Sequence, residues 1–161
     1  DEKIKKFLMA HYQIPDYQAD VCVAFAQGNI GKAVQLATSD SFNEIKNSAL
    51  HLLTNVSKME INDVIATVKS VSEFKIDIQD YLDFLAVWYR DILYFKATRD
   101  SNGLIFKDEL NVITDQINKS SYEGIENILR GLQTAKTRLN ANVNFDLTME
   151  LLFLLIKENL V

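Results

Sequence analysis

The segment DIQDYLDFLAVWYRDILYFKAT, residues 77–98, decides the fold of this chain. Apolar side chains recur along it at steps of three and four residues, which predicts a helix with one buried face; they are Ile78, Tyr81, Leu82, Leu85, Trp88, Tyr89 and Ile92. Other apolar side chains, among them Phe84, Tyr94 and Phe95, fall beside that stripe. A helix this broadly apolar must be covered on two sides, either within its own domain or partly by another chain.

The aromatic side chains of this segment allow two interpretations. Core helices often use aromatic residues, whereas Trp and Tyr are also enriched at the energetic centres of protein interfaces. The leucine-rich run Leu151–Ile156 in the last helix is apolar all round and is expected to be buried in protein. We take five residues as the candidate subunit interface, with a core role as the alternative: Trp88, Tyr89, Tyr94, Phe95 and Phe153.

The first forty residues predict a tight three-helix unit. Its expected helices are Lys3–His11, Asp16–Gln27 and Ile30–Thr38, separated by Pro15 and by Gly28. Proline ends a helical continuation, and glycine is typical of a helix C-terminus. Alanine-rich faces allow the helices to approach closely. We therefore expect one domain over residues 1–40.

The remainder, residues 41–161, predicts a bundle of five or six helices and makes the whole chain all-α. Ser41 with Glu44, and Ser120 with Glu123, have the spacing of a capping box, in which each side chain binds a free backbone N–H of the first helical turn. The boundary between the two domains is expected at residues 40 and 41. No repeat relates the helices to one another.

Composition excludes several classes of protein. Of 161 residues, 48% are apolar and only 5 are Gly and 1 is Pro, which favours long helices. The net charge of −5 repels phosphate backbones, so direct nucleic-acid binding is not expected. No stretch approaches the length of a membrane span, and a single cysteine suits a cytoplasmic protein. The absence of an initial Met predicts a fragment.

The residues that usually carry catalysis are few and scattered. His11 and His51 are the only histidines, and neither belongs to a set of metal ligands. The acidic residues Asp77, Asp80 and Asp83 start a helix, where they complement its dipole. Residues 28–32, GNIGK, have the wrong glycine spacing for a phosphate-binding loop. We expect no enzymatic activity, no metal and no cofactor.

Residues 24–33, AFAQGNIGKA, resemble the end of the lid domain in clamp-loader subunits of the AAA+ superfamily. Members of that family that hydrolyse ATP carry a nucleotide-sensing arginine three residues after the glycine. Aligned on Gly28, that position is Gly31, and a basic residue follows only at Lys32. The resemblance therefore implies a degenerate sensor-2 region at these three residues.

Two further segments are similar to the delta-prime family of bacterial DNA polymerase III clamp-loader subunits. Residues 138–147, RLNANVNFDL, match its C-terminal end, and residues 83–93, DFLAVWYRDIL, match its long helix. The resemblance implies a bacterial cytoplasmic protein with an AAA+ lid over residues 1–40 and a helical collar over residues 41–161, without the nucleotide-binding domain that precedes them in the family.

The same resemblance implies a function without catalysis. The collar would hold the loader ring together by binding other clamp-loader subunits of the gamma/tau and delta types. The sliding clamp and DNA would be met only through the complex, and no membrane is involved. The alternative is the lid and collar of an ATP-hydrolysing gamma/tau-type subunit, against which the glycine at position 31 argues.

Overall fold

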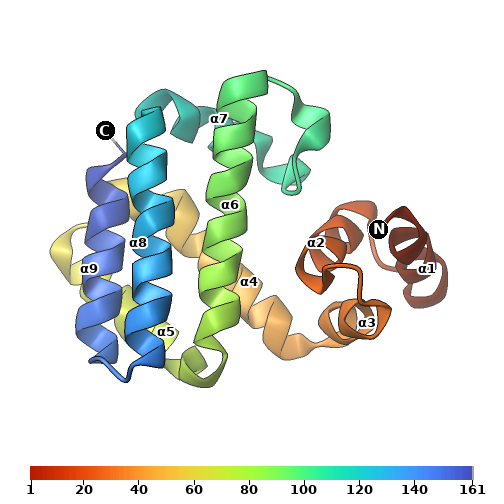
Figure 1. Cartoon of the computed structure of the whole chain (residues 1–161), viewed down its shortest axis with the longest axis horizontal. Helices are drawn as coiled ribbons and strands as arrows, with labels where there is room; N and C mark the ends of the chain where they lie inside the picture. The colour runs from red at the N-terminus through yellow and green to blue at the C-terminus, as the bar shows by residue number, and fades with distance from the viewer. Residues whose placement is uncertain (161) are drawn as a thin grey trace.

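The computed structural model describes residues 1–160, apart from the side chains of residues 75 and 76. Within that part of the chain, nine α-helices and short 3₁₀ turns account for the regular structure, and no strand is present. The predicted all-α class is confirmed. Figure 1 shows three short helices at one end, followed by a larger group of long helices.

The three short helices form what we call the N-terminal unit: α1 (Glu2–Tyr12), α2 (Asp16–Ala26) and α3 (Ile30–Thr38). Its helices surround a small apolar cluster of their own, made of Leu8, Ile14, Ala19, Cys22, Val23, Ala26 and Ala33. The turn between α2 and α3 passes through Gly28 at a φ of 83°, a left-handed conformation that glycine adopts without a steric cost.

The remaining helices form what we call the bundle: α4 (Asp40–Asn55), α5 (Ile61–Val71), α6 (Ile78–Thr98), α7 (Leu110–Lys119), α8 (Tyr122–Asn140) and α9 (Phe145–Glu158). Helices α6, α8 and α9 lie side by side, and α4 and α5 cover them from behind (Figure 1). Helix α6 packs against α4, α7 and α8, so it occupies the centre of the bundle.

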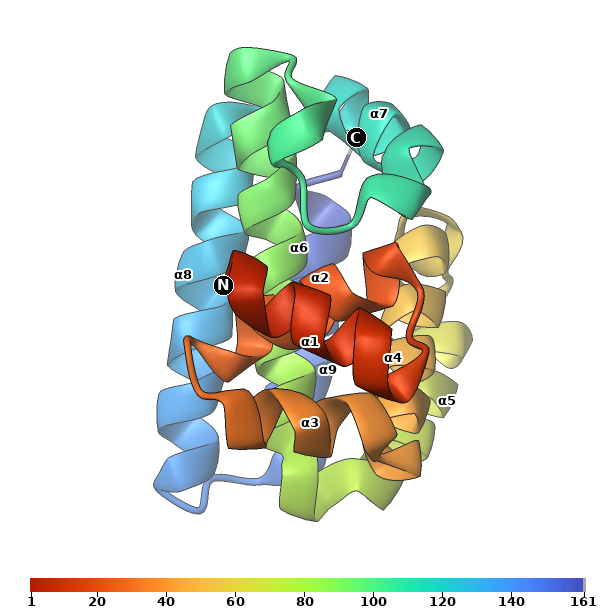
Figure 2. The ribbon, with the colours of Figure 1, turned by 90° about the vertical axis from the view of Figure 1, so that its right-hand side faces the viewer.

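The two-sided apolar pattern of α6 has a structural reason. Tyr81, Trp88 and Tyr89 are fully buried. Phe84 lies one turn before Trp88, and its ring stacks on Phe25 of the N-terminal unit with ring centroids 5.4 Å apart. Seen from the side, the N-terminal unit lies across the face formed by α4 and α6 (Figure 2). The second cover of α6 is therefore supplied by the same chain.

Both predicted capping boxes are wrong, and the serine that caps each helix lies one or two residues from the predicted one. Helix α4 begins at Asp40, and its cap is Ser39, whose hydroxyl accepts the backbone N–H of Phe42. Helix α8 is capped by Ser121. Ser41 is already inside the first helical turn, where its backbone conformation no longer suits a cap. The hydroxyl of Ser120 instead donates to the carbonyl of Gln116 at 2.7 Å.

Candidate subunit interface

Three of the five predicted interface residues lie in the core of the chain. The side chains of Trp88, Tyr89 and Phe153 are 0% exposed, and the surrounding helices of the bundle cover them. Trp88 also donates its indole N–H to the side-chain oxygen of Gln116 at 3.1 Å. A neighbouring subunit could reach these three side chains only if the bundle opened, so their assignment to an interface is corrected to a core role.

The other two predicted residues lie near the C-terminal end of α6. Tyr94 is 38% exposed, and its hydroxyl donates to the carboxylate of Asp100 at 3.1 Å. Phe95 is partly buried and packs against the main apolar cluster. Tyr94 and Phe95 are thus the accessible residues of the predicted set. They form no common surface with Phe153, because Phe153 is buried.

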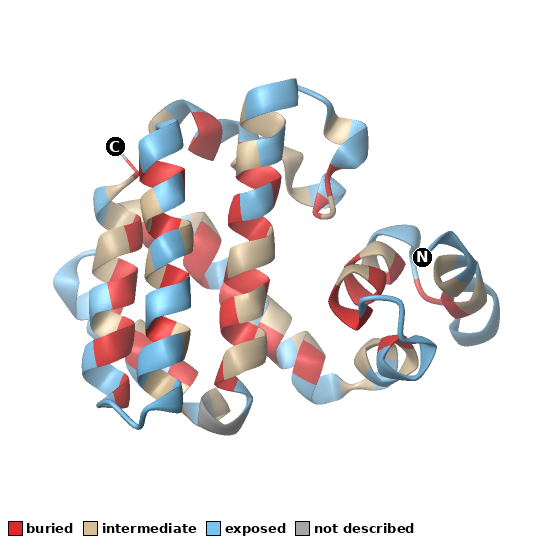
Figure 3. Cartoon of the chain, viewed as in Figure 1, coloured by how far each residue is buried: buried red, intermediate tan, exposed pale blue. Residues whose placement is uncertain are grey.

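Exposed apolar side chains gather instead on the last helix. Leu147 and Leu151 of α9 are 53% and 48% exposed, and Leu155 one turn further is partly exposed. We call these three residues the α9 stripe. They follow one another at four-residue spacing, so they lie on one face of the helix. Figure 3 shows exposed and partly exposed positions of α9 alternating with buried ones. On α5, Ile61 and Ile65 are also exposed.

A groove between α8 and α9 runs beside the α9 stripe. Leu151, Leu152 and Leu155 line one wall and Gly131 and Ala135 the other, with Arg138 at one end. A methyl group added at Gly131 would meet the side chain of Leu155, which shows how closely the two helices approach at this glycine. The groove and the stripe together form an apolar surface that no described part of the chain covers.

The degenerate sensor-2 region is a turn between two helices. Asn29 caps α3 by accepting the backbone N–H of Lys32 at 3.0 Å, and Gly31 is the second residue of that helix. That bond uses the backbone of Lys32. Its side-chain ammonium forms no hydrogen bond or ion pair within residues 1–160. Lys32 lines a cleft between the N-terminal unit and the bundle, opposite Asp80 of α6 and Lys136 of α8.

The acidic residues at the start of α6 differ in their surroundings. Asp83 forms an ion pair with Lys136 across the helices α6 and α8. Burial raises the pKa of Asp80, and the negative charges of Asp83 and Asp77 raise it further, while Lys32 lowers it. These side chains line the cleft rather than a closed site. The attraction between Asp80 and Lys32 acts between the bundle and the N-terminal unit, whereas the Asp83–Lys136 pair lies within the bundle.

A buried acid in the middle of α6 is absent from the residues predicted from the sequence. Asp91 is 4% exposed, and its carboxylate accepts the backbone N–H groups of Ile105 and Phe106 at 2.9 and 2.8 Å. Burial raises the pKa of Asp91, and the two N–H groups oppose that rise. The carboxylate thus holds the loop of residues 99–109 against the bundle. An aspartate among apolar neighbours in the helix was the available signal.

Neither histidine joins a group of potential ligands. His11 lies on the side of α1, where its Nδ1 is 3.1 Å from the carbonyl oxygen of Phe7. No group of three or more His, Cys, Asp or Glu side chains within residues 1–160 could hold a metal ion. None of the helices in the same range is long and apolar enough to cross a membrane.

Comparison with known proteins gives two matches. The family described as DNA polymerase III, delta subunit, C terminal, matches residues 44–158. The DNA polymerase III subunit delta' of Bacillus subtilis (strain 168) is 26% identical over 133 residues, which cover 81% of this chain. The chain spans about 40% of the length of that relative. No solved structure matches significantly. Because the family match covers more than two thirds of the chain, the chain belongs to the family of C-terminal domains of the DNA polymerase III delta subunit.

Proposed function

We propose that this chain is the non-catalytic C-terminal part of a delta-prime-type clamp-loader subunit and that it holds the loader ring together. Residues 41–161 would be the collar, and residues 1–40 the lid. The family match covers most of the proposed collar, and the relative from Bacillus subtilis is a delta' subunit. The partners are other clamp-loader subunits of the gamma/tau and delta types. The sliding clamp and DNA are met only through the complex.

The α9 stripe is the single observation that carries the ring-holding role. Leu147 and Leu151 expose about half of their surface to solvent, on the helix that ends the family match. Burying such side chains against a neighbour gains roughly 25 cal/mol per Å² of apolar surface, which favours assembly. The proposed interface is therefore the α9 stripe, together with the groove beside it. The accessible residues Tyr94 and Phe95 lie at the far end of α6 and form a second, smaller candidate.

The alternative of an ATP-hydrolysing subunit is not favoured by the structure. The position of the sensing arginine is occupied by Gly31, which has no side chain. The nearest cation, Lys32, lies on the wall of the cleft facing Asp80 of the bundle. An ammonium in that position faces the proposed collar across the cleft, without an ion pair to the described residues of the collar.

The experiment is reconstitution of the loader with Leu151→Arg in the full-length subunit, followed by sedimentation analysis. A buried charge in place of an interface leucine should weaken assembly at least about tenfold, or ~1.4 kcal/mol. Ile30→Arg on α3 is the matched control, because Ile30 is equally exposed at 48%. Unchanged assembly of Leu151→Arg, or an equal loss with Ile30→Arg, would reject the α9 stripe as the interface.

A further inference from the structure

The N-terminal unit meets the bundle at an aromatic contact with a hollow on each side. The ring of Phe25 stacks on Phe84 and meets the edge of Phe42, with centroids 5.4 and 5.6 Å apart. A small pocket lined by Tyr17, Val21 and residues 105–109 lies toward the 99–109 loop. The wider cleft lined by Gln27, Lys32 and Asp80 lies toward the start of α6. Figure 2 shows the loop above the unit, with α3 as the lower part of the unit itself.

The covalent connection across this contact is short. Helix α3 ends at Thr38 and α4 begins at Asp40, so Ser39 is the single residue between them. Its backbone is extended, with φ of −87° and ψ of 118°. A single residue outside helical geometry lets two rigid helical bodies change their angle through few dihedrals. The aromatic contact and Ser39 together have the form of a pivot and a hinge.

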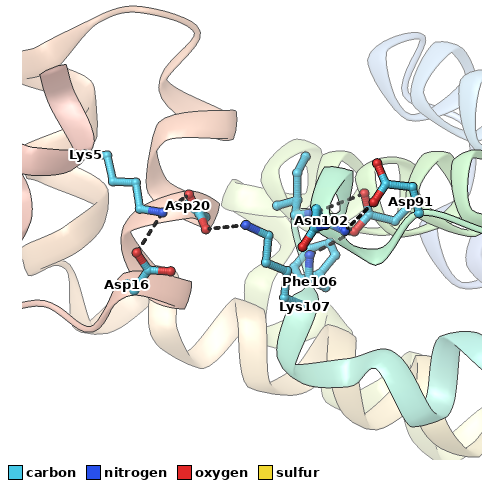
Figure 4. Close-up of polar contacts among 9 residues, drawn as sticks. Lys5, Asp16, Asp20, Asp91, Asn102, Phe106 and Lys107 are labelled. Carbon is cyan, nitrogen blue, oxygen red and sulfur yellow. Dashed lines mark hydrogen bonds and ion pairs between the residues drawn. The ribbon is translucent and has the colours of Figure 1, made fainter. Parts of the chain in front are cut away.

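An incomplete ion pair lies on the loop side of the pivot. Oδ1 of Asp20 is 2.8 Å from the ammonium of Lys5, within the N-terminal unit. Oδ2 is buried and has no hydrogen-bond partner, and the ammonium of Lys107 in the 99–109 loop lies 3.6 Å away from it. Figure 4 shows Lys107 extended toward Asp20 from the loop that Asp91 holds. A buried acceptor without a partner is costly, so a shorter approach of Lys107 would be favourable.

We propose that the N-terminal unit rocks on Phe25 and that its closed position is one in which Lys107 binds Oδ2 of Asp20. Closure on the loop side widens the cleft on the other side, where Lys32 faces Asp80 and Asp83 without an ion pair. The Lys107–Asp20 attraction on the loop side therefore competes with the attraction of Lys32 to the acidic side chains in the cleft. Salt that screens the Lys107 contact shifts the unit away from the loop. The inference concerns this chain alone and does not depend on the proposed ring-holding role.

The test measures the distance between the two parts in the full chain by pulsed electron spin resonance. Spin labels at Lys6→Cys on α1 and Glu126→Cys on α8 occupy exposed sites, in a Cys22→Ala background that removes the one native thiol. We expect two distance populations. Lys107→Gln should lower the ratio of closed to open about two- to fivefold, the size expected of one partly exposed ion pair.

Two further variants make the result specific. Lys119→Gln makes the same substitution at a lysine whose ion pair, with Asp115 at 2.7 Å, lies within α7, and it should leave the ratio unchanged. Lys107→Arg supplies a longer cation with more donors and should raise the closed population. A single distance, identical in the wild type, in Lys107→Gln and at about 0.5 M salt, would overturn the proposal. An equal response of Lys119→Gln would overturn it as well.

Discussion

Oδ2 of Asp91 lies 2.8 Å from the backbone nitrogen of Phe106, and this hydrogen bond joins the centre of α6 to the loop that follows it. The same oxygen accepts the N–H of Ile105 at 2.9 Å. Held in this way, the ring of Phe106 packs on Phe84 and Trp88, with centroids 4.9 and 5.5 Å apart. A buried carboxylate therefore organises the loop whose next residue, Lys107, reaches the N-terminal unit.

Asp91→Asn should destabilise the protein by about 2 kcal/mol, because a neutral amide oxygen accepts hydrogen bonds less strongly than a carboxylate. The NH₂ group would also replace Oδ1, which lies 3.2 Å from the backbone nitrogen of Ile105. Urea unfolding followed by the fluorescence of Trp88, which packs on Phe106, measures the loss. The control is Asp115→Asn, which removes an exposed ion pair with Lys119 and should cost less than about 0.5 kcal/mol. Equal losses in the two variants would contradict the role of Asp91.

Gln116→Leu should cost about 2–4 kcal/mol, although leucine is apolar and of similar size. The side chain of Gln116 is buried, accepts the indole N–H of Trp88 and donates to the carbonyl of Leu53. Replacement leaves both partners buried without a hydrogen bond. The free energy of unfolding measures the cost, and Gln133→Leu on the exposed face of α8 is the control. A Gln116→Leu protein as stable as the wild type would show that the bridge contributes little.

Tyr81→Phe and Tyr89→Phe should leave the protein as stable as the wild type, or stabilise it by up to about 1–2 kcal/mol. Both hydroxyls are buried and have no hydrogen-bond partner in the described part of the chain. Removing them relieves the cost of burying an unpaired polar group. Thermal unfolding of the two variants provides the measurement.

Tyr94→Phe is the comparison for these two variants, because its hydroxyl is paired with Asp100 at 3.1 Å. Loss of that exposed hydrogen bond should lower stability by about 0.5 kcal/mol. If Tyr81→Phe or Tyr89→Phe were instead the more damaging change, a bound water or another partner must satisfy the buried hydroxyl.

Much of the fold follows from the periodicity of the sequence. The helix Ile30–Thr38 has the predicted bounds, and the expected stripe of α6 from Ile78 to Ile92 is buried. The broad apolar surface of residues 77–98 also predicted cover on two sides, which the bundle and Phe25 of the N-terminal unit provide. Cap positions are harder to predict, because a shift of one residue, as from Ser120 to Ser121, hardly changes the apolar pattern of the helix that follows.

The candidate interface was less predictable, for a physical reason. Apolar periodicity shows that a side chain such as Trp88 is covered, but a covering helix from the same chain and one from a partner leave the same pattern. In the run of residues 151–156, every side chain is apolar, so the sequence does not separate buried positions from exposed ones. The run combines the fully buried Phe153 with the half-exposed Leu151, and only the packing of α9 on α5 and α8 separates the two. The charge contacts of Asp20 and Lys107 depend on long-range geometry and leave no local pattern.

Asp80→Asn should stabilise the protein at neutral pH and lose this advantage in acid. Burial, Asp83 and Asp77 raise the pKa of Asp80 in the folded state above its ordinary value of 3.8. The folded state therefore holds the proton more tightly than the unfolded state does. The contribution of Asp80 to stability is full below pH 3.8 and is lost as the pH rises through the folded pKa. At neutral pH the charged form is thus a cost, which asparagine removes.

Because Asp80 is partly exposed, Asp80→Asn should raise the free energy of unfolding at pH 7 by only about 0.5 kcal/mol. This gain should shrink as the pH falls toward about 4. Urea unfolding at a series of pH values measures it. Asp146→Asn is the control, since Asp146 lies exposed in the first turn of α9, where its charge complements the helix dipole. That variant should show no gain at neutral pH. A gain for Asp80→Asn that grows toward acid would mean that the aspartate is stabilised as the anion, with Lys32 rather than Asp83 as its dominant neighbour.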